Sequence, residues 1–126
     1  MIPGIEEYYQ QLGAAVNSAI GVEWNEASLE AIFYPDSIDF EAEYVDGSGK
    51  LTNLAFPPEA VKAFRKLRQL FKDEGKPLWG SARFEINSKG KFNMKWVYDH
   101  CDENGNTIWD KEGWHLRQEE RRRRFS

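Results

Sequence analysis

Apolar residues recur along this chain with two different periods, and each period predicts one kind of element. Between Ile5 and Ile20 they return every three or four positions with polar residues between them, which predicts an amphipathic helix that stops at Gly21. A second helix is expected to begin at Pro57-Pro58-Glu59, because proline fits the first helical turn and an acidic side chain fits the positive end of the helix dipole. This helix is expected to end at Asp73-Glu74-Gly75.

Five other segments alternate between apolar and polar residues or are largely apolar, as strands are. They are Ala27 to Tyr34, Ser37 to Val45, Lys50 to Phe56, Ala82 to Asn87 and Phe92 to Tyr98. Turn signals separate the strands within two groups, and the second helix separates the groups. We therefore predict one α+β domain over residues 1–126, in which an antiparallel sheet of about five strands in two meanders packs against the N-terminal helix and the central helix.

The end of the chain is less regular. Trp109 to Arg124 allows a C-terminal helix, although Gly113 within it weakens that pattern. Residues from about 117 to 126 are expected to form a frayed basic tail, because four consecutive arginines, Arg121 to Arg124, favour solvation.

Charge is distributed unevenly along the chain. Residues 1–49 contain ten acidic residues and no lysine or arginine, whereas residues 50–126 contain the other eleven acidic residues and all 17 basic ones. The first part therefore carries −10 and the second part +6. Such asymmetry bears on partners and association rates rather than on fold. Two faces that attract each other within the molecule would account for it equally well.

Length and cysteine content narrow the class of protein. A chain of 126 residues can bury a core without disulfides or metal, and the single cysteine, Cys101, suits a reducing compartment. The first 21 residues contain no basic residue and resemble no secretory signal, and no apolar run approaches the roughly 20 residues that span a membrane. We expect a soluble, cytoplasmic protein.

The best candidate for chemistry is Asp99-His100-Cys101, which offers a base, a thiol and a carboxylate. Neighbouring residues of a strand point to opposite faces, however, so this adjacency does not assemble a catalytic pair. Cys101, His100 and His115 are too few for a typical zinc site, and no phosphate-binding glycine loop is present. We therefore expect no enzyme, no cofactor and no metal site.

Nucleic acid is the alternative partner. Arg117 and Arg121 to Arg124 offer contacts to phosphates, together with a basic face on the second helix (Lys62, Arg65, Lys66 and Arg68). The overall acidity, with a pI of about 5.3, opposes such binding. A small regulatory protein that binds nucleic acid through the arginine-rich C-terminus remains the second interpretation.

Several short runs together indicate a family. Glu74-Gly75-Lys76-Pro77-Leu78-Trp79 is followed by Ala82-Arg83-Phe84-Glu85-Ile86, by Gly90-Lys91-Phe92 and by Trp96-Val97-Tyr98-Asp99. With the preceding helix, Glu23-Trp24 and Ala31-Ile32-Phe33-Tyr34, this pattern resembles the YezG-like immunity proteins over most of residues 5–100. The arginine-rich tail departs from that pattern.

The resemblance implies an antitoxin that binds a cognate secreted toxin, often a nuclease, and occludes it stoichiometrically without catalysis. It directs attention to the predicted strand over residues 37–45, where Asp39, Glu41 and Glu43 face one way. An acidic sheet face resembles a row of phosphates and suits a basic partner, although an ordinary solvent face would look the same. We predict that the toxin-binding surface includes Asp36, Asp39, Glu41, Glu43 and Asp46.

Overall fold

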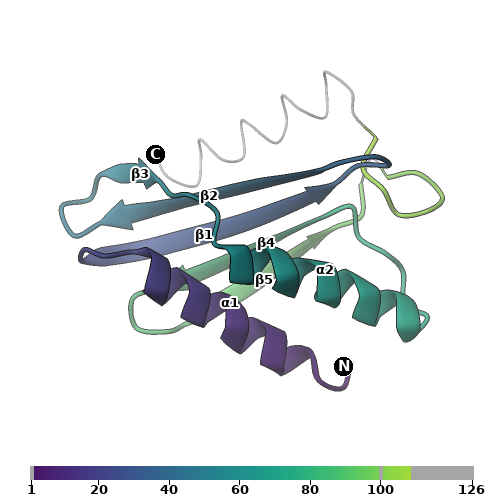
Figure 1. The fold of residues 1–126 in the computed structure, drawn as a ribbon, viewed down its shortest axis with the longest axis horizontal. Helices are drawn as coiled ribbons and strands as arrows, with labels where there is room; N and C mark the ends of the chain where they lie inside the picture. Colours follow the sequence, from purple (N-terminus) through teal and green to yellow (C-terminus); the bar gives the residue numbers. More distant parts are fainter. Residues whose placement is uncertain (1, 100, 109–126) are drawn as a thin grey trace.

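The computed structural model describes residues 2–99 and 101–108, which form the two helices and five strands of Figure 1. In chain order these are α1 (Ile5–Ala19), β1 (Trp24–Phe33), β2 (Ile38–Asp46), β3 (Leu51–Asn53), α2 (Pro58–Asp73), β4 (Ser81–Asn87) and β5 (Phe92–Val97). Pro58 stands in the first turn of α2, as its restricted backbone favours.

The strands form one antiparallel sheet in the order β3-β2-β1-β4-β5. β1 lies at the centre, where Phe33 pairs with Ile38 of β2 and Ile32 pairs with Ser81 of β4. The pairing of β1 with β4 joins the two predicted meanders into one sheet, and α2 connects β3 to β4 (Figure 1). The predicted α+β class with a five-stranded antiparallel sheet is confirmed for the described residues.

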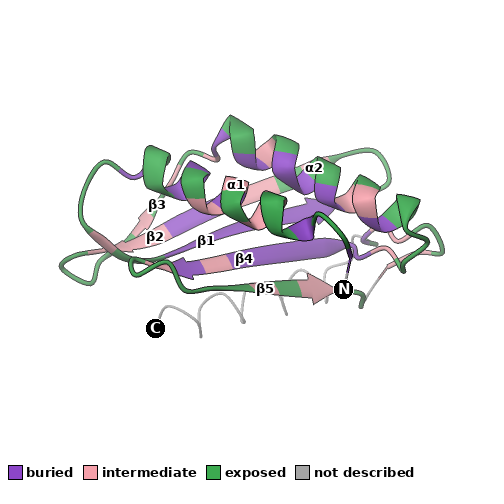
Figure 2. Cartoon of the chain, turned by 90° about the horizontal axis from the view of Figure 1, so that it is seen from below, coloured by how far each residue is buried: buried purple, intermediate pink, exposed green. Residues whose placement is uncertain are grey.

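Both helices lie on one face of the sheet and pack against each other, as Figure 2 shows. The core lies between these two layers because strand residues alternate between faces and the apolar set points toward the helices. The largest fully buried side chains are Trp79, Phe64, Phe84, Leu12, Leu29, Leu67 and Val16. Burial of this apolar surface is the main source of stability.

An aromatic cluster closes one end of the core. The indole ring of Trp79 is completely buried just before β4, with its centroid 5.5 Å from the Phe33 ring, 6.0 Å from the Phe71 ring and 5.1 Å from the Trp96 ring. Edge-to-face and tilted contacts of this kind add to the area that they bury. The cluster therefore fixes the end of α2 against β1, β4 and β5.

The second face of the sheet is more buried than a simple solvent face. Glu30 of β1 and Arg83 of β4 are 8% and 4% exposed, and their charged groups lie 3.9 Å apart. Glu41, Glu30, Arg83 and Lys95 stand in one transverse row of the sheet. This face therefore combines buried charge with the outward acidic residues of β2.

Most predicted elements are observed, with small changes at their ends. β1 begins three residues earlier than predicted, at Trp24, while the third strand is only Leu51–Asn53 rather than residues 50–56. The chain leaves the sheet there because Phe56 turns inward against Phe40 and Phe64, with ring centroids 4.8 Å and 6.1 Å away. The predicted C-terminal helix and basic tail lie outside the described residues.

Truncation of Phe64 tests the two-layer core. Phe64→Ala should lower the free energy of unfolding by about 3–5 kcal/mol, because it leaves a cavity at a fully buried site. Val22→Ala is the control, since Val22 is 58% exposed and its truncation should cost less than about 0.5 kcal/mol. Urea unfolding measures both, and equal losses in the two variants would contradict this core.

Candidate partner-binding surface

The five acidic residues predicted for partner binding lie in different environments. Asp36 and Asp39 are exposed, Glu41 is half-buried and Glu43 is only 8% exposed. Asp39, Glu41 and Glu43 share the sheet face that points away from the helices, because they alternate with the core residues of β2. Asp36 and Asp39 therefore present the most accessible carboxylates of the set.

Asp46 lies at the opposite end of β2 and shapes a turn. Its carboxylate accepts hydrogen bonds from the Ser48 hydroxyl at 2.6 Å, the Ser48 N–H at 2.9 Å and the Lys50 N–H at 3.0 Å. The Ser48 hydroxyl above all, with Lys50, lowers the pKa of Asp46. Asp46 thus orders the connection from β2 to β3, far along the strand from Asp36 and Asp39.

Several connections gather at the end of the sheet that carries Asp36 and Asp39 (Figure 1). We call this region the loop end; it comprises residues 34–37, 77–80, 98–99 and 101–108. Backbone hydrogen bonds hold it together: the Phe33 N–H donates to Gly80 O at 2.7 Å, and the Thr107 N–H donates to Phe33 O at 2.6 Å. Only glycine fits at position 80, because a Cβ there would collide with Cys101 Sγ and Thr107 Oγ1.

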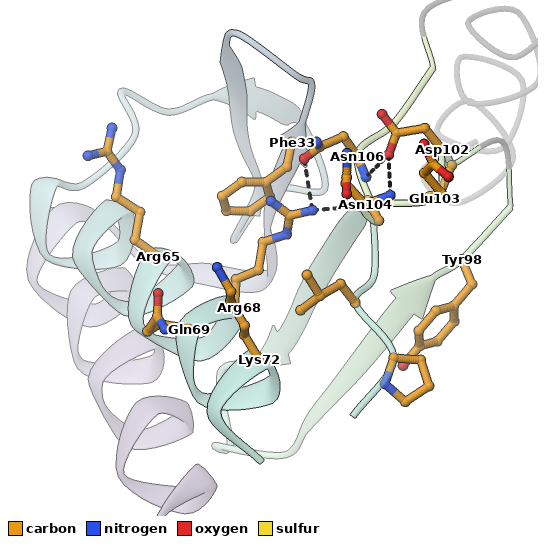
Figure 3. A pocket seen from close by; sticks show the side chains of 14 residues that line it. Phe33, Arg65, Arg68, Gln69, Lys72, Tyr98, Asp102, Glu103, Asn104 and Asn106 are labelled. Carbon is orange, nitrogen blue, oxygen red and sulfur yellow. Dashed lines mark hydrogen bonds between the residues drawn. The ribbon is translucent and has the colours of Figure 1, made fainter. Parts of the chain in front are cut away.

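Arg68 of α2 anchors the 102–106 turn of the loop end, as Figure 3 shows. Its guanidinium donates hydrogen bonds to Gly105 O at 2.6 Å, Asn106 Oδ1 at 3.0 Å and Trp79 O at 3.3 Å. The same group stacks 4.6 Å above the Phe33 ring. Burial lowers the pKa of Arg68, but the guanidinium stays protonated at neutral pH.

Asp102 completes the turn from the other side. Its carboxylate accepts the N–H groups of Asn104 and Asn106, each at 2.9 Å. Gly105 has a positive φ of 76°, and a Cβ there would collide with Leu78. The turn is therefore held by its own hydrogen bonds as well as by Arg68.

A cleft of about 850 Å³ opens between α2 and the loop end (Figure 3). Exposed Arg65 and Lys72 line it from α2, while Tyr98 and Glu103 line it from the loop end. A second hollow of about 370 Å³ is lined by Tyr34, Pro35, Asp36, Ser37, Asp39, Thr107 and Ile108. The loop end therefore presents apolar surface next to both acidic and basic side chains.

The candidates for chemistry are not assembled into a catalytic site within the described residues. Burial raises the pKa of the Cys101 thiol, and its Sγ lies 3.5 Å from Asp99 O, whereas His100 and His115 lie outside those residues. No group of three or more metal-binding side chains occurs in residues 2–99 and 101–108. No helix of that part of the chain is long and apolar enough to cross a membrane.

Sequence reasoning placed Arg68 with Lys62, Arg65 and Lys66 on one basic helix face. The structure separates it from them, because Arg68 turns toward the loop end while the other three are exposed. The position of Arg68 beside the apolar stripe of α2 was the one sign in the sequence that this side chain is partly buried. Its hydrogen-bond partners, at Trp79, Gly105 and Asn106, could not be predicted because they are distant in the sequence. Arg117 and Arg121 to Arg124 lie outside the described residues.

The architecture is a two-layer α+β domain with its connections gathered beside a cleft. A family model described as "Immunity protein YezG-like" matches residues 56–119, 64 of the 126 residues, and the chain belongs to the YezG-like immunity protein family. The match includes α2, β4 and β5, whereas Glu23-Trp24 and Ala31 to Tyr34 lie outside it. No curated protein matches the chain.

Removal of Arg68 should loosen the loop end. Arg68→Ala removes three hydrogen bonds and a stacking contact, so it should destabilise the protein by about 1–3 kcal/mol and speed amide exchange at Asn104 and Asn106. Arg65→Ala, an exposed change on the same helix, should alter neither property. Hydrogen exchange followed by mass spectrometry distinguishes them, and unchanged exchange in Arg68→Ala would contradict the anchoring role.

Proposed function

We propose that this protein binds one cognate bacterial toxin, a nuclease, and neutralises it by stoichiometric occlusion. Membership of the YezG-like immunity protein family carries the proposal, because that family implies a toxin partner and is generally not enzymatic. The protein would act in the cytoplasm, where its free thiol, Cys101, stays reduced.

The acidic character of the N-terminal part supports a nuclease as the toxin. A nuclease binds the phosphates of its substrate through basic groups, and an acidic protein surface offers those groups an alternative partner. Residues 1–49 carry −10, so long-range attraction would also speed the encounter with a basic toxin. Such steering weakens as salt screens it.

We place the main contact at the hollow beside Asp36 and Asp39. Its apolar residues include Ile108, which is 47% exposed, and the two carboxylates stand at its margin. An apolar surface patch surrounded by polar groups is typical of protein interfaces. Of the other predicted residues, Glu41 and Glu43 would contribute mainly to the negative field, and Asp46 through the turn that it orders.

Co-expression tests the function itself. The reading frame adjacent to this gene in its host should encode a protein that stops growth when expressed alone and is harmless when this chain is present. The two proteins should co-purify in a 1:1 complex. Continued toxicity in the presence of the folded chain, or the lack of any complex, would contradict the proposal.

Charge reversal tests the proposed surface. Asp36→Lys with Asp39→Lys should weaken toxin binding by at least about tenfold and reduce its dependence on salt, because attractive contacts become repulsive. Glu23→Lys with Glu26→Lys is the matched control: these exposed carboxylates lie at the other end of β1 and should change affinity much less. Calorimetry at two salt concentrations measures both, and equal effects of the two pairs would place the contact elsewhere.

A further inference from the structure

β5 forms one edge of the sheet, and its outer backbone groups have no strand partner among the described residues. The Asn87 N–H donates to Lys91 O, and the Phe33 N–H donates to Gly80 O. These two hydrogen bonds show which backbone groups of β4 face β5 and which face β1. Because pairing alternates along an antiparallel ladder, Asn93 and Lys95 bond toward β4. The N–H and C=O groups of Phe92, Met94 and Trp96 therefore point away from the sheet.

Large apolar side chains line this open edge on the helix side. Phe92 is 49% exposed and Tyr98 is 48% exposed, while Met94 and Trp96 are half-buried between them. Figure 2 shows the two helices on this face, with β5 at the border of the sheet. The Phe92 ring lies 5.3 Å from that of Tyr9, so α1 contributes a further aromatic group.

The charge of the β4–β5 hairpin distinguishes between possible occupants of the edge. Residues 86–98 contain Lys89, Lys91 and Lys95 and no acidic residue. Of these three lysines, Lys95 has its amino group 3.5 Å from the carboxylate of Glu85 in β4. Pairing of two copies along β5 would bring six lysines together, and lysine on an edge strand is a common protection against such pairing. A strand that carries carboxylates would instead be attracted.

We propose that the outer edge of β5 receives an extended segment of the cognate toxin, which adds a sixth strand to the sheet. This inference rests on the proposed function and identifies a second contact for the same partner. The segment would place apolar side chains at alternate positions against Phe92 and Trp96, and acidic ones on the other face near Lys95. Main-chain hydrogen bonds would provide affinity, and the side chains would provide selectivity.

The position of β5 is compatible with simultaneous contact at Asp36 and Asp39. Asp39, Ile32, Ser81 and Val97 occupy one transverse row of the sheet, so the C-terminal end of β5 lies at the loop end. β2 and β5 are separated only by β1 and β4, and neighbouring strands are about 4.8 Å apart. A single toxin domain is therefore wide enough to contact both Asp39 and the edge of β5. Its surface would carry basic groups near Asp39 and an acidic strand beside Lys95.

Hydrogen exchange in the wild-type complex tests the proposal directly. The probe is the toxin that co-purifies from co-expression with the adjacent reading frame. The amides of Phe92, Met94 and Trp96 should exchange rapidly in the free protein and at least about tenfold more slowly in the complex. A stable complex in which these amides exchange as in the free protein would overturn the proposal and leave the proposed function intact.

A proline substitution provides the second test. Met94→Pro removes the central outward N–H, which β4 does not use, and should weaken toxin binding about 10- to 100-fold. Met94→Ala retains that N–H and should weaken binding less than about fivefold. Circular dichroism and thermal unfolding verify that both variants fold, and equal affinities of the two would contradict strand addition.

Sedimentation of the free protein distinguishes the toxin from a second copy. The wild-type protein should remain monomeric at concentrations where the toxin complex forms. A dimer that Met94→Pro dissociates would assign the edge to self-association and overturn the proposal. Absence of any toxin complex would contradict the proposed function as well. Negative results in the preceding two tests would contradict only the proposal of strand addition at β5.

Discussion

The pairing of β1 with β4 is the contact on which the other features depend. Its register places Ile32 opposite Ser81 and Leu29 opposite Phe84, residues that belong to separate parts of the sequence. Without it, the hairpin of β4 and β5 would lack the central strand and the core beneath it. The same pairing brings Phe33 to Gly80, where residues 34–37, 77–80 and 101–108 meet. The loop end is thus a direct consequence of how the two meanders join.

Local patterns in the sequence predicted the helices and strands because each element satisfies a local rule. Pro58 and Glu59 suit the start of α2, and the alternation around Phe84 and Ile86 suits β4. The strand order was not predictable, since alternation records which face a residue occupies and not which strand lies beside it. Arg68 was assigned to a solvent face for the same reason, because its bonds depend on tertiary contacts.

The candidate surface was only partly predictable. Alternation placed Asp39, Glu41 and Glu43 on one face, but it carried no information about burial, and Glu43 is nearly inaccessible. Asp36 and Asp39 lie beside the loop end. Tertiary contacts assemble that region, so the sequence pattern could not single out these two carboxylates. The lysines of the β4–β5 hairpin carry the opposite charge and lie apart from these carboxylates. Lys89 and Lys91 lie at the other end of the sheet, because Asn87 pairs with Glu26, whereas Lys95 lies within β5. A partner that engages both the carboxylates and the lysines must present complementary charges in a defined arrangement, which is one physical basis for specificity.

Titration of the purified toxin with this protein, with cleavage of nucleic acid as the readout, tests the central claim most directly. A protein that acts by occlusion should lower the activity linearly and abolish it at one equivalent, provided that the toxin concentration is well above the dissociation constant. Inactivation of the toxin by much less than one equivalent would indicate turnover. That result, or full activity at an excess of the folded protein, would contradict the account.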